Sequence, residues 1–264
     1  MSCPSATLVV WASAWLHGTA AADDLLDAIS AWEIEHHICA FDEGTAAALE
    51  LPTRDEPAAA PATLLGALRR AGVTGGGMVL PVPGDVRGLG GRSAFAEAAL
   101  SCGEAVVLAG GNLGLVPERF AEGIMRWTVF DLPDGPPREQ MPISEAENEL
   151  AGSMRAAATA LIELGVARHR PNVRGEMEAI IAARPQPGWP EGMPNRAARV
   201  LQRADELEAI LTVAATDSPG GALSASAARA RDTVLRPLQH AVRGARQAAV
   251  DEAVRVFSEQ VDPR

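Results

Sequence analysis

One loop combines the residue types that bind anions. Residues 80–92 read Leu-Pro-Val-Pro-Gly-Asp-Val-Arg-Gly-Leu-Gly-Gly-Arg and lead from an apolar run into a predicted helix. Asp85 follows Gly84, and the guanidinium groups of Arg87 and Arg92 come shortly after it. Backbone amides ahead of a helix, aided by an arginine, can hold a carboxylate or a phosphate. The loop therefore predicts an anion site.

The same loop also has a purely structural interpretation. Its glycines can serve only to turn the chain, Asp85 can cap a turn, and the arginines can pair with the acidic surface. The sequence matches neither a P-loop nor the GxGxxG fingerprint of dinucleotide-binding proteins. Both interpretations stay open at the level of sequence.

More polar side chains follow the ends of the predicted strands. Strands are expected at Leu8–Ala12, His37–Phe41, Met78–Val82 and Ala105–Ala109. If these strands are parallel neighbours, the loops at their carboxyl ends meet. The side chains brought together would be His17, Asp42, Asp85, Arg87 and Asn112. The Asp42-Glu43-Gly44 turn either leads outward to a loop or reverses the chain into a hairpin over residues 42–51; the hairpin is favoured and would separate some of these side chains.

Metal binding finds little support in the sequence. His17, His36 or His37 could act with Asp42, but adjacent residues of a strand point to opposite faces. No HExxH motif or comparable spacing is present. We predict neither a metal site nor a cofactor.

Covalent catalysis is not indicated either. The segment Gly91-Arg92-Ser93-Ala94-Phe95 lacks the closing glycine of a GxSxG elbow, and Ser93 is better explained as a helix cap. Cys39 and Cys102 have no nearby histidine in sequence to activate them. All basic residues are arginine, so a lysine Schiff base is excluded. We therefore predict no catalytic residue.

Composition bounds the remaining possibilities. A chain of 264 residues, 47% hydrophobic and 22% charged, is long enough for two ordinary domains. Residues 1–150 carry 8 arginines against 21 acids, whereas residues 151–264 carry 15 against 13. The acidic first half disfavours nucleic acid and anionic membranes. Three scattered cysteines and the absence of basic residues before the first apolar run indicate a cytoplasmic protein without a signal peptide or membrane span.

Strand and helix patterns alternate over residues 1–140. Thr19 is expected to cap a helix that carries Leu25, Leu26 and Ile29. Further helices are expected around Leu64, Leu65 and Leu68 and from Ser93 to Leu100, and a hairpin is expected to end at Phe130. This pattern predicts an α/β domain with a mixed sheet covered by helices.

Residues 141–264 have helical patterns only. Apolar residues recur at spacings of 4 and 3 in two segments: Leu150, Met154, Ala157, Leu161, Leu164 and Val200, Ala204, Leu207, Leu211, Ala214. Such seams predict an all-α antiparallel helical bundle. Its last helix should be kinked near Pro237. Arg229, Arg236 and Arg243 recur every seven residues and form either a basic stripe for a partner or the solvated rim of a core seam.

Several short segments resemble a set of actinobacterial hypothetical proteins that have no assigned activity. They are Leu8-Val9-Val10-Trp11-Ala12, Leu80-Pro81-Val82-Pro83-Gly84-Asp85, Gly103-Glu104-Ala105-Val106-Val107, Gly114-Leu115-Val116-Pro117 and Arg126-Trp127-Thr128-Val129. The resemblance covers most of the chain. It implies no substrate, cofactor or catalytic residue.

Two functions of different classes follow. The first is a non-catalytic binding or scaffolding module that contacts a protein partner or a second copy through the helical bundle. The alternative is an enzyme or sensor that acts on a small anionic metabolite at the Gly84–Arg92 loop, with Asp85 or Asp42 as base and Arg87 as charge clamp. Sequence alone does not separate the enzyme from the sensor.

Overall fold

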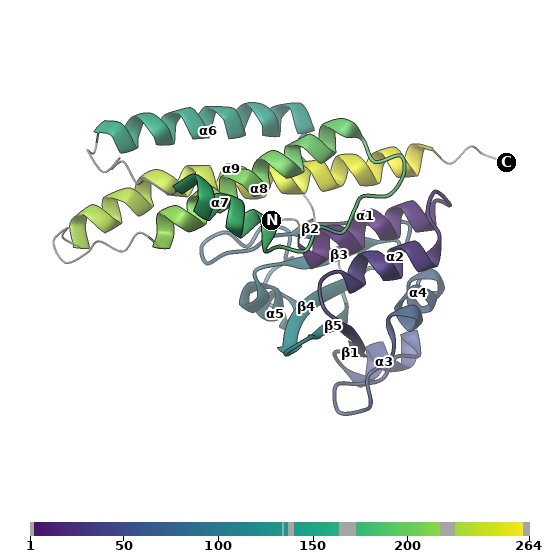
Figure 1. Ribbon diagram of the computed structural model, residues 1–264. Coiled ribbons are helices and arrows are strands. Elements are labelled where there is room, and N and C mark those ends of the chain that lie inside the picture. Colours follow the sequence, from purple (N-terminus) through teal and green to yellow (C-terminus); the bar gives the residue numbers. More distant parts are fainter. Residues whose placement is uncertain (1–2, 134, 137–139, 164–172, 217–224, 261–264) are drawn as a thin grey trace. The chain divides into compact units, whose positions relative to one another are not determined.

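The computed structural model describes residues 3–133, 135–136, 140–163, 173–216 and 225–260. Helices and strands alternate in the first half, and helices alone follow (Figure 1). In chain order the elements are α1 Pro4–Leu16, α2 Ala22–Ser30, β1 Glu35–Ala40, α3 Glu43–Leu49, α4 Pro61–Arg70, β2 Gly75–Val79, α5 Ala94–Cys102, β3 Ala105–Ala109, β4 Leu113–Ala121, β5 Ile124–Asp131, α6 Ile143–Glu163, α7 Val173–Ala182, α8 Asn195–Thr216 and α9 Ala225–Glu259.

The chain divides into two compact units. The first, here called the sheet unit, comprises Ser2–Gln140, Gln186–Pro194 and Val250–Arg264. The second, here called the helical unit, comprises Met141–Pro185 and Asn195–Ala249, together with Met1. Helix α9 therefore contributes its earlier turns to the helical unit and its last turns to the sheet unit.

The strands of the sheet unit form one mixed sheet in the order β1-β5-β4-β3-β2. β1 pairs with β5 in parallel, and the other three neighbouring pairs are antiparallel. β1, β5 and β3 therefore run in one direction, and β4 and β2 run in the other. A mixed sheet with helices is what the sequence predicted. The condition under which the strand-end residues would converge is not met, since β1 and β2 lie at opposite edges of the sheet.

The strand predicted near the start of the chain is wrong, because this segment forms helix α1. The strand expected at Leu8–Ala12 lies inside this helix, which begins with Pro4 at its first turn. Nearly every residue of α1 is buried, because the helix packs on β2, β3 and β4 and also contacts α2. A helix that is buried on all sides has no polar face, so its apolar residues do not recur at helical spacing. The adjacent β-branched residues Val9 and Val10 then give a pattern that is typical of a strand.

Two local predictions around α2 and α3 are also wrong. The hairpin expected over residues 42–51 is instead α3, because Asp42 accepts the backbone N–H of Thr45 and caps the helix. Thr19 does not cap α2, whose N-cap is Ala21. Thr19 instead closes α1, with its backbone N–H and its hydroxyl both bonded to the carbonyl of Ala14.

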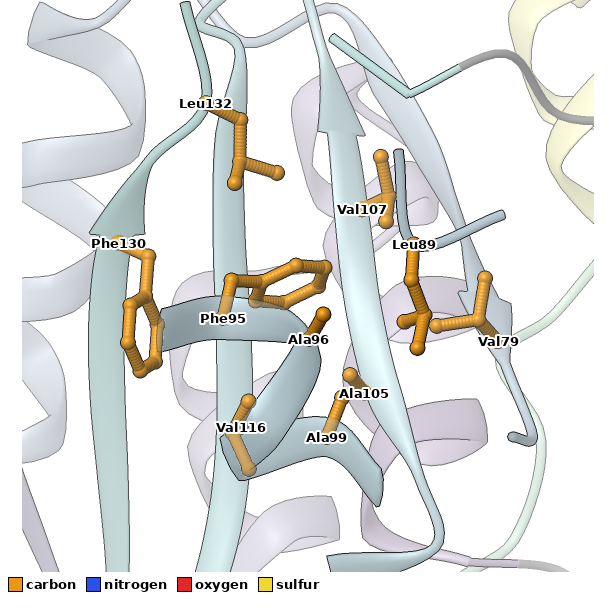
Figure 2. Close-up of a cluster of buried hydrophobic side chains, with 10 residues drawn as sticks. All are labelled: Val79, Leu89, Phe95, Ala96, Ala99, Ala105, Val107, Val116, Phe130 and Leu132. Atoms are coloured by element: carbon orange, nitrogen blue, oxygen red, sulfur yellow. The ribbon is translucent and has the colours of Figure 1, made fainter. Parts of the chain in front are cut away.

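The two faces of the sheet carry different helices. Met78 of β2 contacts Cys3, just ahead of α1, whereas the next residue, Val79, joins the core beneath α5. Adjacent strand residues point to opposite faces, so α1 and α5 cover opposite sides. Figure 2 shows the α5 side, where buried apolar side chains from α5 and the strands gather. Its members are Val79, Leu89, Phe95, Ala96, Ala99, Ala105, Val107, Val116, Phe130 and Leu132.

Phe95 is the centre of this core. It is 1% exposed, and its ring meets that of Phe130 edge to face at 5.6 Å between centroids. Gly114 of β4 makes room for it, because a Cβ there would lie 2.6 Å from Cε2 of Phe95. The helix predicted from Ser93 to Leu100 is confirmed, with the Ser93 hydroxyl capping it by accepting the N–H of Ala96.

Side-chain contacts between α6 and α8 help to hold the helical unit together. Arg196 of α8 pairs with Glu147 of α6, and Arg203 contacts the sulfur of Met154. Both members of the second contact lie seven residues beyond those of the first, so α6 and α8 run in the same direction. The seam position Leu207 is 2% exposed. None of the helices within the described ranges is long and apolar enough to cross a membrane.

Candidate ligand-binding site

The structure separates the predicted constellation of strand-end residues. Asp42 follows β1 and Asn112 follows β3, and these strands run in the same direction, so both residues leave one end of the sheet. β2 is antiparallel to β3 and therefore leads toward Asp85 and Arg87 from the other end. His17 is not at a strand end, because it is the C-cap of α1.

The Gly84–Arg92 loop satisfies its own charges. Arg87 donates from Nε and Nη2 to the two carboxylate oxygens of Asp85, at 2.9 and 3.1 Å. Leu89 is 3% exposed and anchors the loop in the α5 core. Gly84 and Gly88 have positive φ angles of 88° and 80°, as the turns require. The structural interpretation therefore accounts for Asp85 and Arg87, while Arg92 is exposed.

Asp42 also has a structural task. Its carboxylate accepts the Thr45 N–H at 2.8 Å, and this bond is the main reason why its pKa lies below the ordinary value. The Thr45 hydroxyl adds a smaller lowering, although it forms no hydrogen bond of good geometry and is buried without a partner. Asp42 is thus held ionised as a helix cap.

His36, His17 and Cys102 each have a structural contact. His36 is 5% exposed and accepts the indole N–H of Trp127 at Nδ1, and burial lowers its pKa. His17 contacts the carbonyl of Ser13 through Nδ1. Desolvation, aided by the Glu104 carboxylate, raises the pKa of the Cys102 thiol to about 12, although the residue as a whole is exposed. Across the described residues, no three ligating side chains are placed to hold a metal ion.

A cleft of about 590 Å³ opens between the end of α1, the start of α2 and one side of α4. Trp15 lies at its wall and is 7% exposed. The guanidinium carbon of Arg69 lies 4.3 Å from the centre of the Trp15 ring, so the cation stacks on the indole. Leu26 and Leu65 add apolar surface. The volume lies within the range of small-molecule sites, although the cleft is open to solvent and its two charged residues, Asp23 and Arg69, are exposed.

Two opposite charges line this cleft. Arg69 comes from the last turn of α4, and Asp23 comes from the first turn of α2. The two side chains do not pair with each other. In the part of the chain that the structure describes, neither side chain forms an ion pair or a hydrogen bond with any other residue.

The turn between α1 and α2 builds one wall of the cleft. Gly18 has a φ of 78°, a left-handed conformation that glycine adopts without strain. Its N–H bonds to the carbonyl of Trp15, and Thr19 bonds to Ala14, so the carbonyls at the end of α1 are satisfied. The chain then reverses into α2 and places Asp23 opposite α4.

A smaller cleft, of about 250 Å³, lies at the sheet end that Asp42 and Asn112 share. Its lining residues are Gly44, Thr45, Ala48, Leu49, Ala71, Gly111, Leu113 and Asp131. Asp131 is its one ionisable lining residue, and it has no acid or base beside it there. This cleft therefore brings together less binding chemistry than the first.

The helical unit buries a charged cluster of its own. Arg246 of α9 is 5% exposed and bonds to Asp205 of α8 at 2.8 Å, with Glu208 at 3.6 Å. Burial lowers the pKa of Arg246 to about 9. Burial also raises the pKa of Glu208, and the charges of Arg184 and Arg243 partly offset this second shift. Of the predicted arginine stripe, Arg243 thus faces an acid of the same unit.

The chain belongs to the Rv1486c-like family. The model for the Rv1486c-like protein N-terminal domain matches residues 5–141, and the model for the C-terminal domain matches residues 144–247. The resemblance to actinobacterial proteins without an assigned activity is therefore confirmed.

Mycobacterial proteins match this chain along almost their whole length. The chain is 39% identical to uncharacterized protein MT1533 and 38% identical to uncharacterized protein Rv1486c, both of Mycobacterium tuberculosis, covering 95% of this chain and 96% of each relative. It is 36% identical to uncharacterized protein ML1804 of Mycobacterium leprae, over 95% of this chain and 97% of that protein. No solved structure matches the chain.

Sequence reasoning missed the residues of the larger cleft. Trp15, Asp23 and Arg69 come from three helices, one of which was predicted as a strand. A double arginine at the end of a predicted helix was visible, but no spacing joins it to a tryptophan far earlier in the chain. Only their meeting in space identifies the cleft.

Proposed function

We propose that the protein is a non-catalytic binding or scaffolding module. One observation carries the proposal: the side chains that the sequence offered as a general base, Asp42 and Asp85, and the possible metal ligand His36 are engaged in structural contacts. Asp42 caps α3, Asp85 holds Arg87, and His36 accepts the indole N–H of Trp127. An enzyme would need at least one such group directed at a substrate.

The directions of the pKa shifts support the same proposal. The pKa of Asp42 and that of His36 are lowered, and that of Cys102 is raised to about 12, so each moves away from neutrality. Proton transfer in the cytoplasm is most efficient for a group with a pKa near 7. Glu104 and Glu208 have raised pKa values, but Glu104 accepts the N–H of Ser5 at the start of α1, and Glu208 lies beside Arg246.

The helical unit is proposed as the surface that contacts a protein partner or a second copy. Its helices would form the predicted bundle, with antiparallel packing left to α7 and α9 because α6 and α8 run in the same direction, and the proposed location is the cytoplasm. Ile162 of α6 and Ile210 of α8 leave apolar surface on these helices, being 70% and 38% exposed, although Ile34 and Phe120 of the sheet unit are 87% and 51% exposed. Single exposed apolar residues are normal on a protein surface, so the helical unit is proposed for its long seamed helices, which offer contact surface.

The alternative, a metabolite site at the Gly84–Arg92 loop, needs Arg87 to leave Asp85. A bidentate arginine–carboxylate contact fixes both groups in one geometry, and an incoming anion would have to replace it. No observation at this loop favours that exchange, so the binding module is the function proposed.

Mass spectrometry tests the proposal. The intact chain and an Asp42→Asn, Asp85→Asn double variant would be purified from the same host and compared in native and denaturing spectra. Asparagine keeps the helix cap but cannot act as a base, so we expect the same retained partner, ligand and subunit number in both. A molecule held intact by the variant but converted by the wild type would overturn the proposal.

A further inference from the structure

We infer that the cleft lined by Trp15, Asp23 and Arg69 binds an α-amino acid with an apolar side chain. The inference rests on the proposed function of a binding module and names its small ligand. It begins with the two charges. Arg69 and Asp23 line one cleft, do not pair with each other, and have no other ionic or hydrogen-bond partner among the described residues.

Opposite charges in one cleft select a ligand that carries both signs. The guanidinium of Arg69 presents N–H donors that match a carboxylate in a bidentate manner. The Asp23 carboxylate accepts hydrogen bonds from an ammonium group. An α-amino acid carries both groups, so each cleft charge gains a partner and no net charge is brought in.

Stacking on Trp15 places the arginine in advance. The 4.3 Å separation between the Arg69 guanidinium carbon and the indole centre holds the cation against the wall of the cleft. A stacked guanidinium keeps its N–H groups in the ring plane, where they stay available to a ligand. Arg69 therefore loses less side-chain freedom on binding than a fully mobile arginine would.

The remaining surface is apolar and accommodates a hydrocarbon side chain. Leu26 of α2 and Leu65 of α4 lie in the lining together with several alanines. The volume of about 590 Å³ exceeds what a single ion needs and suits a small organic molecule. Burial of a leucine-sized side chain against these walls would supply the apolar part of the affinity.

Other ligand classes fit these residues less well. A phosphate group with two negative charges would meet Arg69 but also the carboxylate of Asp23. A metal ion would meet Asp23 but be repelled by Arg69, and no second acid lines the cleft. A neutral apolar ligand would contact neither charge, since both side chains are exposed and would stay hydrated, so it would gain only the apolar part of the affinity.

Calorimetric titration tests the inference with three probes and four variants. The probes are L-leucine, N-acetyl-L-leucine, which lacks the ammonium group, and L-leucinamide, which lacks the carboxylate. The variants are Arg69→Met and Asp23→Asn, with Arg155→Met and Asp27→Asn as matched controls outside the cleft. Thermal melting would establish that all the variants are folded before titration.

We expect the intact chain to bind leucine, and to bind each derivative at least about tenfold more weakly. Arg69→Met should bind leucine and leucinamide equally, because it lacks the guanidinium that contacts the carboxylate. Asp23→Asn should bind leucine and N-acetyl-leucine equally, because it lacks the carboxylate that contacts the ammonium group. The controls should match the intact chain. The inference is overturned if no probe binds up to about 10 mM, if the derivatives bind as well as leucine, or if the cleft variants behave as the controls do.

The failure of the proposed function gives a different result. Leucine recovered after incubation should have an unchanged mass. A converted product would reject the non-catalytic module and leave the cleft assigned as the site where the amino acid binds. If the intact chain does not bind leucine but keeps the same oligomer mass, the inference about the cleft is rejected and the proposed binding module is unaffected.

Discussion

The two units bury their side chains in different ways. Beneath α5 the sheet unit buries apolar side chains alone, with Phe95 and Phe130 at the centre. The helical unit buries Arg246 between α8 and α9, where Asp205 and Glu208 balance its charge. Apolar burial is non-directional and proportional to area, whereas a buried ion pair stabilises only if its geometry is held. The stability of the sheet unit therefore depends on how well apolar side chains fill its core. The stability of the helical unit also depends on the register between α8 and α9, which places Arg246 beside its acids.

Polar groups in the sheet unit core are mostly neutral pairs. Trp127 donates to His36, and Trp32 donates to Thr7, each across a long sequence separation. These bonds satisfy buried donors without burying a full charge. Both interiors nevertheless keep buried polar atoms without a hydrogen-bond partner, among them Nε2 of His36 in the sheet unit and Nε of Arg246 in the helical unit. The two interiors therefore differ in the charge that they bury and not in how completely their polar atoms are satisfied.

Removal of the central aromatic of the sheet unit should have the largest effect. Phe95→Ala leaves a cavity among fully buried neighbours, and we expect the free energy of unfolding to fall by about 4 kcal/mol. Chemical denaturation with two spectroscopic probes would measure it. The exposed Phe120→Ala serves as the control and should cost far less, since its ring is 51% exposed. Equal losses would mean that the apolar core is not where this unit gains its stability.

Arg246→Met should cost less, about 3 kcal/mol, although it leaves two carboxylates near an apolar side chain. The cost is limited because the Asp205 and Glu208 side chains keep 22% and 30% exposure. Arg255→Met is the matched control in the same helix. That arginine pairs with Glu252 and Glu259 but is 52% exposed, and a loss below about 1 kcal/mol is expected. A smaller effect at Arg246 than at Arg255 would contradict the comparison.

Pro237→Ala should stabilise the helical unit. Pro237 lies inside α9 and is exposed, and it cannot donate a backbone hydrogen bond to the preceding turn. Alanine restores that donor, so we expect an increase of about 2 kcal/mol in the free energy of unfolding. Pro185, which follows the end of α7, provides the control, and its replacement by alanine should have little effect. A loss of stability in Pro237→Ala would indicate that the kink predicted there is required for packing.

The smallest effect concerns pH. Desolvation raises the pKa of Glu104 above the ordinary value of 4.5, so the folded state holds this proton more firmly than the unfolded chain does. Its contribution to stability is full below pH 4.5 and is lost as the pH rises through the folded pKa. Glu104→Gln should remove this slope, and the exposed Glu97→Gln should not. Thermal melting from acid to neutral pH would measure the difference, and identical pH profiles would contradict it.

Amphipathic elements were predictable because each carries its own signal. Leu64, Leu65 and Leu68 mark α4 through the helical period, and Ser93 marks the start of α5 through its capping hydroxyl. The helical seams around Leu150 and Leu207 are buried for the same reason. These elements face the core on one side and solvent on the other, so the sequence records the division.

Elements without two distinct sides were not predictable in this way. Helix α1 is buried almost throughout and therefore reads as a strand through Val9 and Val10. The Asp42-Glu43-Gly44 turn signal was equally compatible with a hairpin and with the capped helix α3. Packing against the sheet decides the first case, whereas in the second the local cap from Asp42 to the Thr45 N–H selects the helix.

The sequence by itself determined the mixed α/β character of the first half, the helical second half, the absence of familiar catalytic motifs and the membership of a family. Tertiary structure decided which strands are neighbours, and so separated Asp42 from Asp85. It also brought Trp15, Asp23 and Arg69 from three helices to one cleft. The reason is that strand order and helix packing depend on contacts between distant residues, which a local pattern does not encode.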